Sequence, residues 1–204
     1  NLGYNLKAGG SYTLDNKHTF YVNSGLYSRQ PYHDNIYLNF TNEVNPLTSN
    51  EKIFGLEAGY TFKSKLFSAS LNAYRTSWED RVVSSSRVVT AATETVGTTV
   101  LTQGDLVYKS NLGVQQLHTG LELDFVLKPI DKLDVRGFAS IGNWEYKGQS
   151  ITRQTDENQN LLAETLVDVD GGKVGDAAQT SWGLGAKYEI FKREAYWKHF
   201  VIYT

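Results

Sequence analysis

Residues 51–81 read EKIFGLEAGYTFKSKLFSASLNAYRTSWEDR, and this stretch decides the fold. Apolar side chains occupy every second position in two runs. The first run contains Phe54, Leu56, Ala58, Tyr60 and Phe62, and the second contains Phe67, Ala69, Leu71 and Ala73. Because successive side chains of a strand point to opposite faces, this alternation predicts two strands. The three residues 63–65 between the runs predict a tight hairpin turn.

The length of the two runs favours a membrane protein. Each run keeps its alternation for about ten residues, whereas strands of soluble proteins cluster near roughly five or six. A tilted strand needs roughly 9 to 11 residues to cross a bilayer. From Phe54 to Phe62 the strand would run for ~26 Å, which a tilt of about 40° reduces to roughly 20 Å of height. That height is close to the apolar band between the aromatic girdles of outer-membrane barrels, so we predict a transmembrane β-hairpin.

The same plan recurs along the chain. Further alternating runs cover residues 2–14, 20–29, 117–127, 133–146 and 182–190, and a last run at 195–204 alternates poorly. Short turns are predicted at 15–17, 63–65, 129–132 and 192–194. They alternate along the chain with long connections at about 30–52, 82–112 and 147–178. Outer-membrane barrels sort their loops in this way, with the short turns at the periplasmic rim. We therefore predict an all-β, transmembrane, antiparallel up-and-down β-barrel of which about eight strands are present.

Composition limits the other possibilities. The mean hydropathy of −0.40 is typical of soluble proteins, but a barrel turns half of each strand toward a polar lumen, which hides its membrane face in the average. A net charge of −2 gives no reason to expect nucleic acid as a partner. The 204 residues include no Cys, which excludes a disulfide framework, and no Met. Without an initiator Met, we expect a processed chain or a fragment.

One charged residue departs from the pattern. Arg75 lies in the same register as the apolar set that ends at Ala73. A lipid-facing charge near the middle of the membrane costs about 2 to 4 kcal/mol. We therefore expect Arg75 to lie at the level of the headgroups, or a bulge to switch its face.

Three segments resemble a known family. Residues 42–81 (NEVNPLTSNEKIFGLEAGYTFKSKLFSASLNAYRTSWEDR), the VGDAAQT at 174–180, and the first 41 residues, which include YSRQPYHDNIYLNF at 27–40, resemble the late barrel region of TonB-dependent outer-membrane receptors of the Bacteroidetes type. The resemblance implies a barrel of about 22 strands with an N-terminal plug and a TonB box, neither of which is in this chain. Residues 1–204 would be a partial barrel wall.

The resemblance also implies a function. Such receptors import a scarce nutrient across the bacterial outer membrane, here a glycan, a peptide or a metal chelate, and they are not enzymes. The expected contacts are outer-membrane lipid and, through the absent N-terminal region, TonB. If the barrel is of the SusC type, a SusD-like surface lipoprotein is the expected partner.

Two groups of side chains are candidates for the functional site. Aromatic residues on or next to the rim with the long loops could stack on a ligand, although an interfacial girdle or loop packing would also explain them; they are Tyr32, His33, Tyr37, Trp78 and Trp144. Charged residues on the polar faces of the predicted strands are expected to face the lumen and to pair with each other or with a plug. They are Lys7, Glu57, Lys63, Glu122, Asp124, Lys187 and Glu189.

The sequence predicts no catalytic residue, cofactor or metal site. The four His are scattered without metal-ligand spacing. The Asp168–Gly171 segment resembles the start of a calcium loop, but Gln179 stands where the bidentate Glu belongs. Ser68, Ser70 and His118 could face one another, yet nothing marks either Ser as an activated nucleophile.

Two alternatives to an importer remain open at the level of sequence. The first is a receptor-derived barrel that acts as a structural or docking subunit of an envelope complex. The second is a free-standing eight-stranded barrel, which requires residues 195–204 to pair with residues 2–14.

Overall fold

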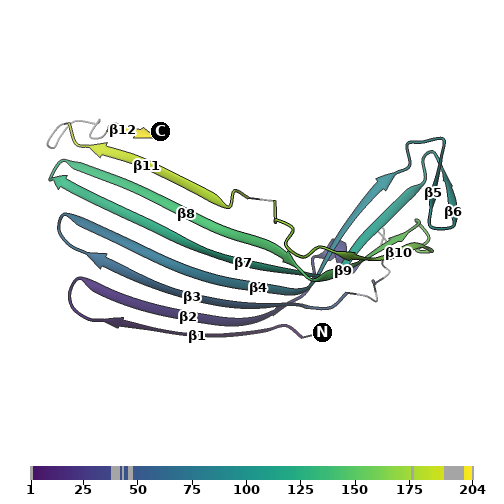
Figure 1. The fold of residues 1–204 in the computed structure, drawn as a ribbon, viewed down its shortest axis with the longest axis horizontal. Helices are drawn as coiled ribbons and strands as arrows, with labels where there is room; N and C mark the ends of the chain where they lie inside the picture. The colour runs from purple at the N-terminus through teal and green to yellow at the C-terminus, as the bar shows by residue number, and fades with distance from the viewer. Residues whose placement is uncertain are drawn as a thin grey trace.

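The computed structural model describes residues 2–37, 42, 44–45, 48–175, 177–190 and 200–203. Its main element is one curved antiparallel sheet, and neighbouring strands along the main path are joined by hydrogen bonds (Figure 1). In spatial order these strands are β1 (Tyr4–Thr13), β2 (His18–Arg29), β3 (Glu51–Lys63), β4 (Phe67–Val88), β7 (Leu106–Ile130), β8 (Leu133–Lys147), β11 (Thr180–Tyr188) and β12 (Phe200–Tyr203). The prediction of an all-β antiparallel sheet of about eight wall strands is confirmed.

The hairpin at residues 51–81 forms as predicted. β3 and β4 pair so that Ala58 lies opposite Ala73 and Tyr60 lies opposite Leu71. The backbone N–H of Ser64 donates to the carbonyl of Phe67 (2.8 Å), and the Ser64 hydroxyl accepts from the Phe67 N–H (3.0 Å), which closes the turn.

Pairing continues the apolar face across the wall. Leu71 lies opposite Leu123, and Leu123 lies opposite Ala139, so apolar residues of successive strands share one face. These side chains are exposed rather than buried: Trp182, on the same face, is 75% exposed. A water-soluble sheet would cover such a large apolar face. An exposed apolar face over several long strands is what contact with lipid requires.

Two of the predicted long connections contain strands. Within 82–112, β4 continues to Val88 and β7 already begins at Leu106, with the small hairpin of β5 (Thr93–Val96) and β6 (Thr99–Thr102) between them. Within 147–178, β9 (Gln149–Thr155) pairs with β7 and with β10 (Leu161–Asp168). Register shifts between Trp78 and Val83 interrupt the alternation, which explains why the sequence pattern ended there.

The first long connection, 30–52, is mostly irregular in its described part. It contains the short helix α1 (His33–Ile36) and a bridge between Tyr37 and Val44, and β3 begins at its end. No helix in the described part of the chain is long and apolar enough to cross a membrane. The predicted turn at 192–194 lies outside the described residues.

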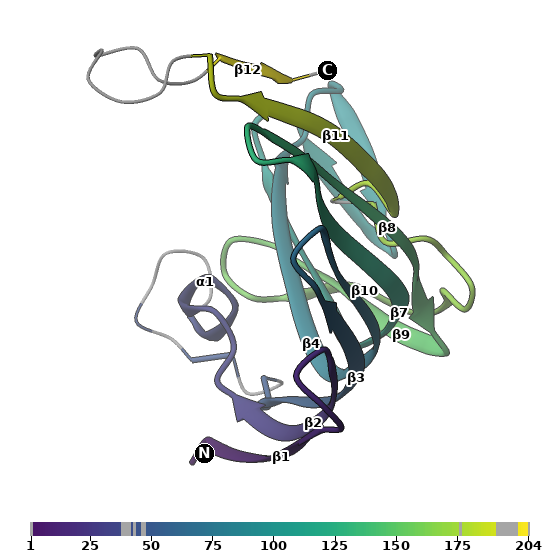
Figure 2. The same ribbon diagram turned by 90° about the vertical axis from the view of Figure 1, so that its left-hand side faces the viewer.

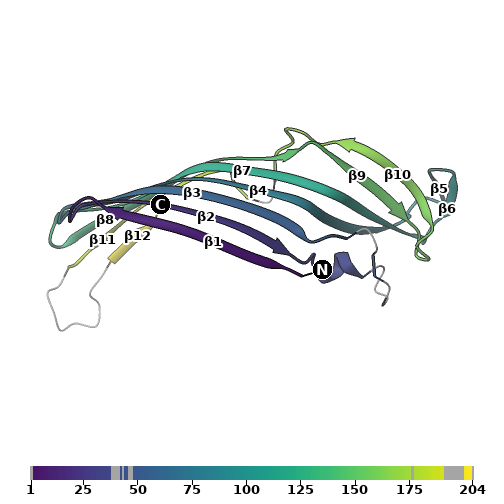
Figure 3. The same cartoon turned by 90° about the horizontal axis from the view of Figure 1, so that it is seen from below.

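The strands beyond the wall form an extension with a core of its own. Val89, Val96, Leu101, Val107 and Leu162 are buried together there. The extension and α1 lie at one end of the wall, whereas the β1–β2, β3–β4 and β7–β8 turns lie at the other (Figure 3). The sheet bends where the extension begins, because Asp80 (φ 59°) and Gly113 (φ 66°) adopt left-handed backbone conformations close to the register shifts of β4.

The wall is an open arc in end view (Figure 2). In the part of the chain that the structure describes, β1 pairs with β2 and β12 pairs with β11, and the two strands do not pair with each other. The pairing required for a free-standing eight-stranded barrel is thus absent from this arrangement. Residues 195–199 and 204 of that predicted last strand lie outside the described residues.

The two faces of β8 allow a direct test of the orientation. Ala139 belongs to the apolar face, and the adjacent Ser140 belongs to the polar face. In the intact protein folded into lipid vesicles, Ala139→Arg is expected to lower the free energy of unfolding by about 2 to 4 kcal/mol, because it places a charge in lipid. Ser140→Arg, the matched control, should have a much smaller effect in the same urea titration. Equal effects of both variants would contradict this assignment of faces.

The core of the extension can be tested with two neighbouring leucines. Leu162 is 7% exposed and Leu161 is 55% exposed. We expect Leu162→Ala to destabilise the extension by about 2 kcal/mol or more, because it opens a cavity in a packed core. Hydrogen exchange should then rise in 93–107 and 149–168 but not in the wall. Leu161→Ala should change little, and exchange that rose equally in the wall would show that the extension has no separate core.

Candidate functional site

A hollow of about 680 Å³ lies on the polar face of the wall. Six strands, β1 to β4, β7 and β8, contribute to its lining. The side chains that matter most below are Lys7, Glu57, Asn72, Tyr74, Trp78, His118, Glu122 and Trp144. The hollow lies on the side of the sheet that alternation predicted to face the lumen.

Three adjacent strands place a row of aromatic rings in this hollow. The His118 ring lies between Trp78, at 4.4 Å between centroids, and Trp144, at 5.1 Å with an angle of 14° between the planes. The Trp144 Nε1–H donates a hydrogen bond to the Tyr74 hydroxyl (2.9 Å). The register explains the row, because His118 lies directly opposite Trp144 in the β7–β8 pair.

Glycines let these rings lie against the sheet. A Cβ at Gly120 would come within 2.5 Å of the Tyr74 hydroxyl, and one at Gly142 would come within 2.8 Å of Trp144 Nε1. Any larger residue would therefore push Tyr74 or Trp144 out of its place. The positions of the rings thus depend on Gly120 and Gly142 as well as on the aromatic residues.

Polar side chains form a second row beside the rings. The Tyr21 hydroxyl lies 3.3 Å from a Glu57 carboxylate oxygen and 3.1 Å from the Asn72 side-chain oxygen, and the Asn72 side-chain amide donates to Glu122 (3.4 Å). The Lys7 ammonium lies 5.4 Å from the centre of the Tyr27 ring. Two carboxylates and one ammonium therefore line the hollow, which gives it a negative balance of charge.

A buried ionic network lies where the wall meets the extension. Glu51 is 1% exposed and accepts a hydrogen bond from Arg29 (2.6 Å), and Arg81 Nε lies 3.6 Å from its other oxygen. Arg81 also donates to the side-chain oxygen of Gln116 (2.6 Å). The hydrogen bond to Glu51 raises the pKa of Arg29 above its ordinary value. The network joins β2, β3, β4 and β7 next to the aromatic row.

Asn35 attaches α1 to the same region. Its side-chain amide donates to the carbonyl of Val82 (2.8 Å), and its side-chain oxygen accepts from the Ser84 N–H (3.1 Å). Asn35 is buried, and the two bonds satisfy backbone groups of β4 beside the register shift. The first connection is thus fastened to the base of the extension.

Two of the five predicted aromatic contacts come together. Trp78 and Trp144 line the hollow, but Tyr32, His33 and Tyr37 lie outside it on the connection that carries α1. The Tyr32 ring lies 4.8 Å from the Arg29 guanidinium, and the rings of His33 and Tyr37 lie 4.6 Å apart with an angle of 38° between their planes. The role of all five as ligand contacts stays a prediction.

Sequence reasoning missed two rings and the ionic network. Both rings could have been predicted from alternation. Tyr74 shares a face with Trp78, and pairing the strands of the third hairpin would have placed His118 opposite Trp144. The network had no such signal. The bulge in β4 turns Arg81 toward Glu51, and no regular alternation predicts a bulge.

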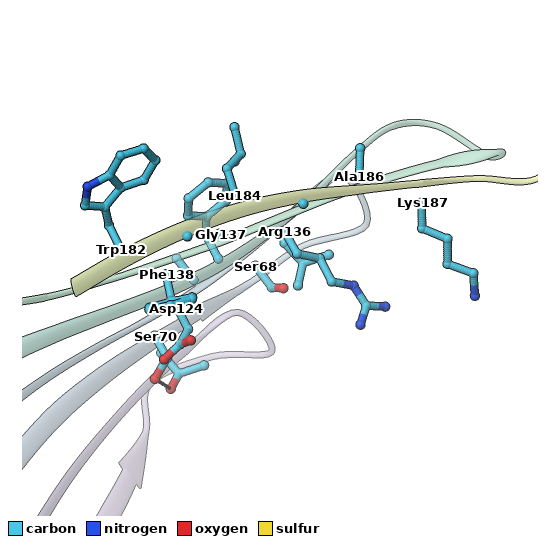
Figure 4. Close-up of a pocket in the computed structure, with 16 residues that line it drawn as sticks. Ser68, Ser70, Asp124, Arg136, Gly137, Phe138, Trp182, Leu184, Ala186 and Lys187 are labelled. Atoms are coloured by element: carbon cyan, nitrogen blue, oxygen red, sulfur yellow. Dashed lines mark hydrogen bonds between the residues drawn. The ribbon is translucent and has the colours of Figure 1, made fainter. Parts of the chain in front are cut away.

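The predicted lumen charges are distributed along the polar face. Lys7, Glu57 and Glu122 line the hollow described above, whereas Asp124 and Lys187 line a second hollow of about 670 Å³ toward the end with the short turns. Figure 4 shows Ser68, Ser70, Asp124, Arg136 and Lys187 on one side of the sheet and Trp182, Leu184 and Ala186 on the other. Lys63 ends β3, and Glu189 follows β11, where its N–H donates to the carbonyl of Lys132 (2.8 Å).

The described residues form neither a hydrolytic Ser–His pair nor a metal site. Ser70 lies opposite Asp124, whereas His118 lies opposite Thr76, so neither Ser68 nor Ser70 is beside the imidazole. Within the described ranges no group of three or more His, Cys, Asp or Glu is placed to hold a metal ion.

Removing the buried carboxylate should loosen the region around the network. We expect Glu51→Gln to destabilise this region by about 1 to 3 kcal/mol, because Arg29 and Arg81 lose the charge of a buried partner. Hydrogen exchange should rise in 29–37 and 81–84. Glu164→Gln removes a partially exposed partner of Arg153 and is the matched control. If the two variants behave alike, burial of Glu51 does not contribute to order at this site.

Comparison with known proteins gives one match. The model of the family described as TonB dependent receptor-like, beta-barrel, matches residues 2–202. Searches of curated proteins and of solved structures gave no significant match.

Proposed function

Because this chain belongs to the TonB-dependent receptor-like β-barrel family, we propose that it forms part of the wall and of the extracellular gate of an importer of a scarce nutrient. The family comprises outer-membrane receptors and transporters that work with TonB, and it is not a family of enzymes. The open edges of the arc support a place in a larger barrel, since lipid leaves no partner for unpaired backbone groups.

The observation that carries the proposal is the aromatic row inside the polar hollow. Trp78, His118 and Trp144 present ring faces next to the carboxylates of Glu57 and Glu122. Ring faces stack on flat apolar surfaces of a ligand, and carboxylates accept hydrogen bonds from hydroxyl or amino groups. His118 Nε2 is buried and has no hydrogen-bond partner in the described part of the chain, so a ligand hydroxyl that entered between the rings would give it one.

This chemistry suits some of the expected substrates better than others. A neutral glycan or a peptide with a free amino group would find both stacking and acceptors. A strongly anionic metal chelate would meet the negative balance of the hollow and be repelled. For a glycan, a SusD-like surface lipoprotein would be the natural partner on the extracellular side.

The extension favours a second candidate function. Its separate core and its strands beyond the wall would give a rigid platform for another envelope protein. A receptor-derived barrel that served only as a docking subunit would keep this platform and would not need the aromatic row. Binding of an envelope protein to the platform of a receptor that takes up no substrate would favour this second function.

The test is a binding experiment on the complete receptor with two tryptophan variants. Trp144 faces the hollow, and Trp182 faces lipid. A panel of oligosaccharides, peptides and ferric chelates would be titrated against the receptor in detergent, with calorimetry as the readout. For the class that binds, we expect Trp144→Ala to weaken affinity roughly ten-fold, because a buried aromatic contact is worth more than about 1 kcal/mol.

Trp182→Ala is the matched control and should leave affinity unchanged. Uptake of the same compound by cells should require TonB. If no class binds, or if both variants weaken binding equally, the hollow is not the substrate site.

A further inference from the structure

On β4, β7 and β8 the outward face of the wall changes from apolar to polar at one row, beyond which β7 carries one more apolar residue, Leu117. On β4 the change falls between Ala73 and Arg75, and on β7 it falls between Leu121 and Thr119. On β8 it falls between Ile141 and Asn143. The register places Arg75 opposite Thr119 and Thr119 opposite Asn143, so the first polar residues of three strands form one row.

This row marks the edge of the membrane on the side of the extension. Arg75 is exposed on the outward face of β4. A lipid-facing charge in mid-membrane costs about 2 to 4 kcal/mol and costs much less near the headgroups. Headgroups therefore lie against the row.

Arg75 has no anionic partner in the described part of the chain. Its side chain is exposed, and its neighbours in the row are Leu56 and Thr119. A charge at this level costs little compared with one in mid-membrane, but the guanidinium still has five N–H donors to satisfy. The expectation that Arg75 lies at the level of the headgroups stays a prediction.

Two more cations lie at the other end of the row. The Lys173 ammonium contacts the Asn143 side-chain oxygen and lies 2.8 Å from Glu145, and Lys147 lies 2.8 Å from the other oxygen of Glu145. A backbone bridge between Glu145 and Lys173 fixes this segment against β8. The hydrogen bond from Lys147, followed by that from Lys173, lowers the pKa of Glu145 to about 2.

The cations at the row outnumber the carboxylates that contact them. Lys147 and Lys173 share Glu145, and Arg75 has no carboxylate partner in the described residues. Arg75 and Asn143 are two strand spacings apart, which is about 10 Å between their backbones. The Thr119 hydroxyl lies between them and donates only a long hydrogen bond, of 3.4 Å, to the Asn143 carbonyl.

We propose that Arg75, Thr119 and Lys173 bind the phosphate of an anionic lipid in the outer leaflet. The guanidinium pairs with two phosphate oxygens, the ammonium contributes charge, and the hydroxyl turns to donate to the phosphate. The lipid is favoured over free phosphate because Leu121 and Ile141 are exposed directly below the row, where acyl chains would cover them. This site lies on the lipid face and does not depend on what the hollow binds.

The experiment measures lipid retained by the complete receptor. The receptor would be reconstituted in phosphatidylcholine nanodiscs that contain a minor fraction of lipid A, and bound lipid A would be counted by native mass spectrometry. Arg75→Gln and Lys173→Met are each expected to reduce retention roughly five-fold, since one basic residue near a membrane surface contributes about the corresponding affinity. The double variant should lose more than either.

The controls separate this site from general charge effects. Arg136→Gln removes a cation from the opposite, polar face and should not change retention. Heat-modifiable migration on gels checks that each variant is folded. Unchanged retention in folded Arg75→Gln, equal loss in Arg136→Gln, or displacement of the lipid by inorganic phosphate at comparable concentration would each overturn the proposal.

Discussion

Hydrogen bonding of the backbone is the constraint on which this structure depends. Lipid offers no partner for a peptide N–H or C=O, so every strand of the wall must be paired over its whole membrane length. The ladders of β2, β3, β4, β7 and β8 meet this demand with continuous antiparallel registers. A slip of one residue would move every apolar side chain to the wrong face. The membrane thus fixes the register, and the register fixes which side chains meet on the polar face.

The aromatic row is a consequence of that register. Trp78, His118 and Trp144 come from three strands and are far apart in sequence, yet they lie within ring contact because their strands are locked in phase. Glycine at positions 120 and 142 leaves the space that the rings occupy. The wall therefore positions its candidate binding surface with the same hydrogen bonds that let it cross the membrane, and loops are not needed for this purpose.

Alternation in the sequence was sufficient to predict the strands of the wall but not those of the extension. The hairpin at 51–81, its apolar face and the approximate number of wall strands follow from period two, because lipid on one side and water on the other impose that period. The extension is surrounded by water, so its outer residues need no strict alternation. Its strands were consequently predicted as loops. The bulge that turns Arg81 toward Glu51 depends on contacts between strands, which single-strand patterns do not record.

The unusual features of this chain lie at the boundary between lipid and water. On the inner side of that boundary the buried Glu51 holds Arg29 and Arg81 against the bulge, and on the outer side Arg75 and Lys173 face the headgroups. All of these residues except Lys173 lie on strands that continue from the wall into the extension or end at its base, and Lys173 is bridged to β8 at Glu145. Because a strand is stiff along its hydrogen-bonded ladder, a force on the extension reaches the boundary residues through β4 and β7 first. Any ligand or partner that moved the extension would therefore act against the ionic contacts inside and against the lipid outside.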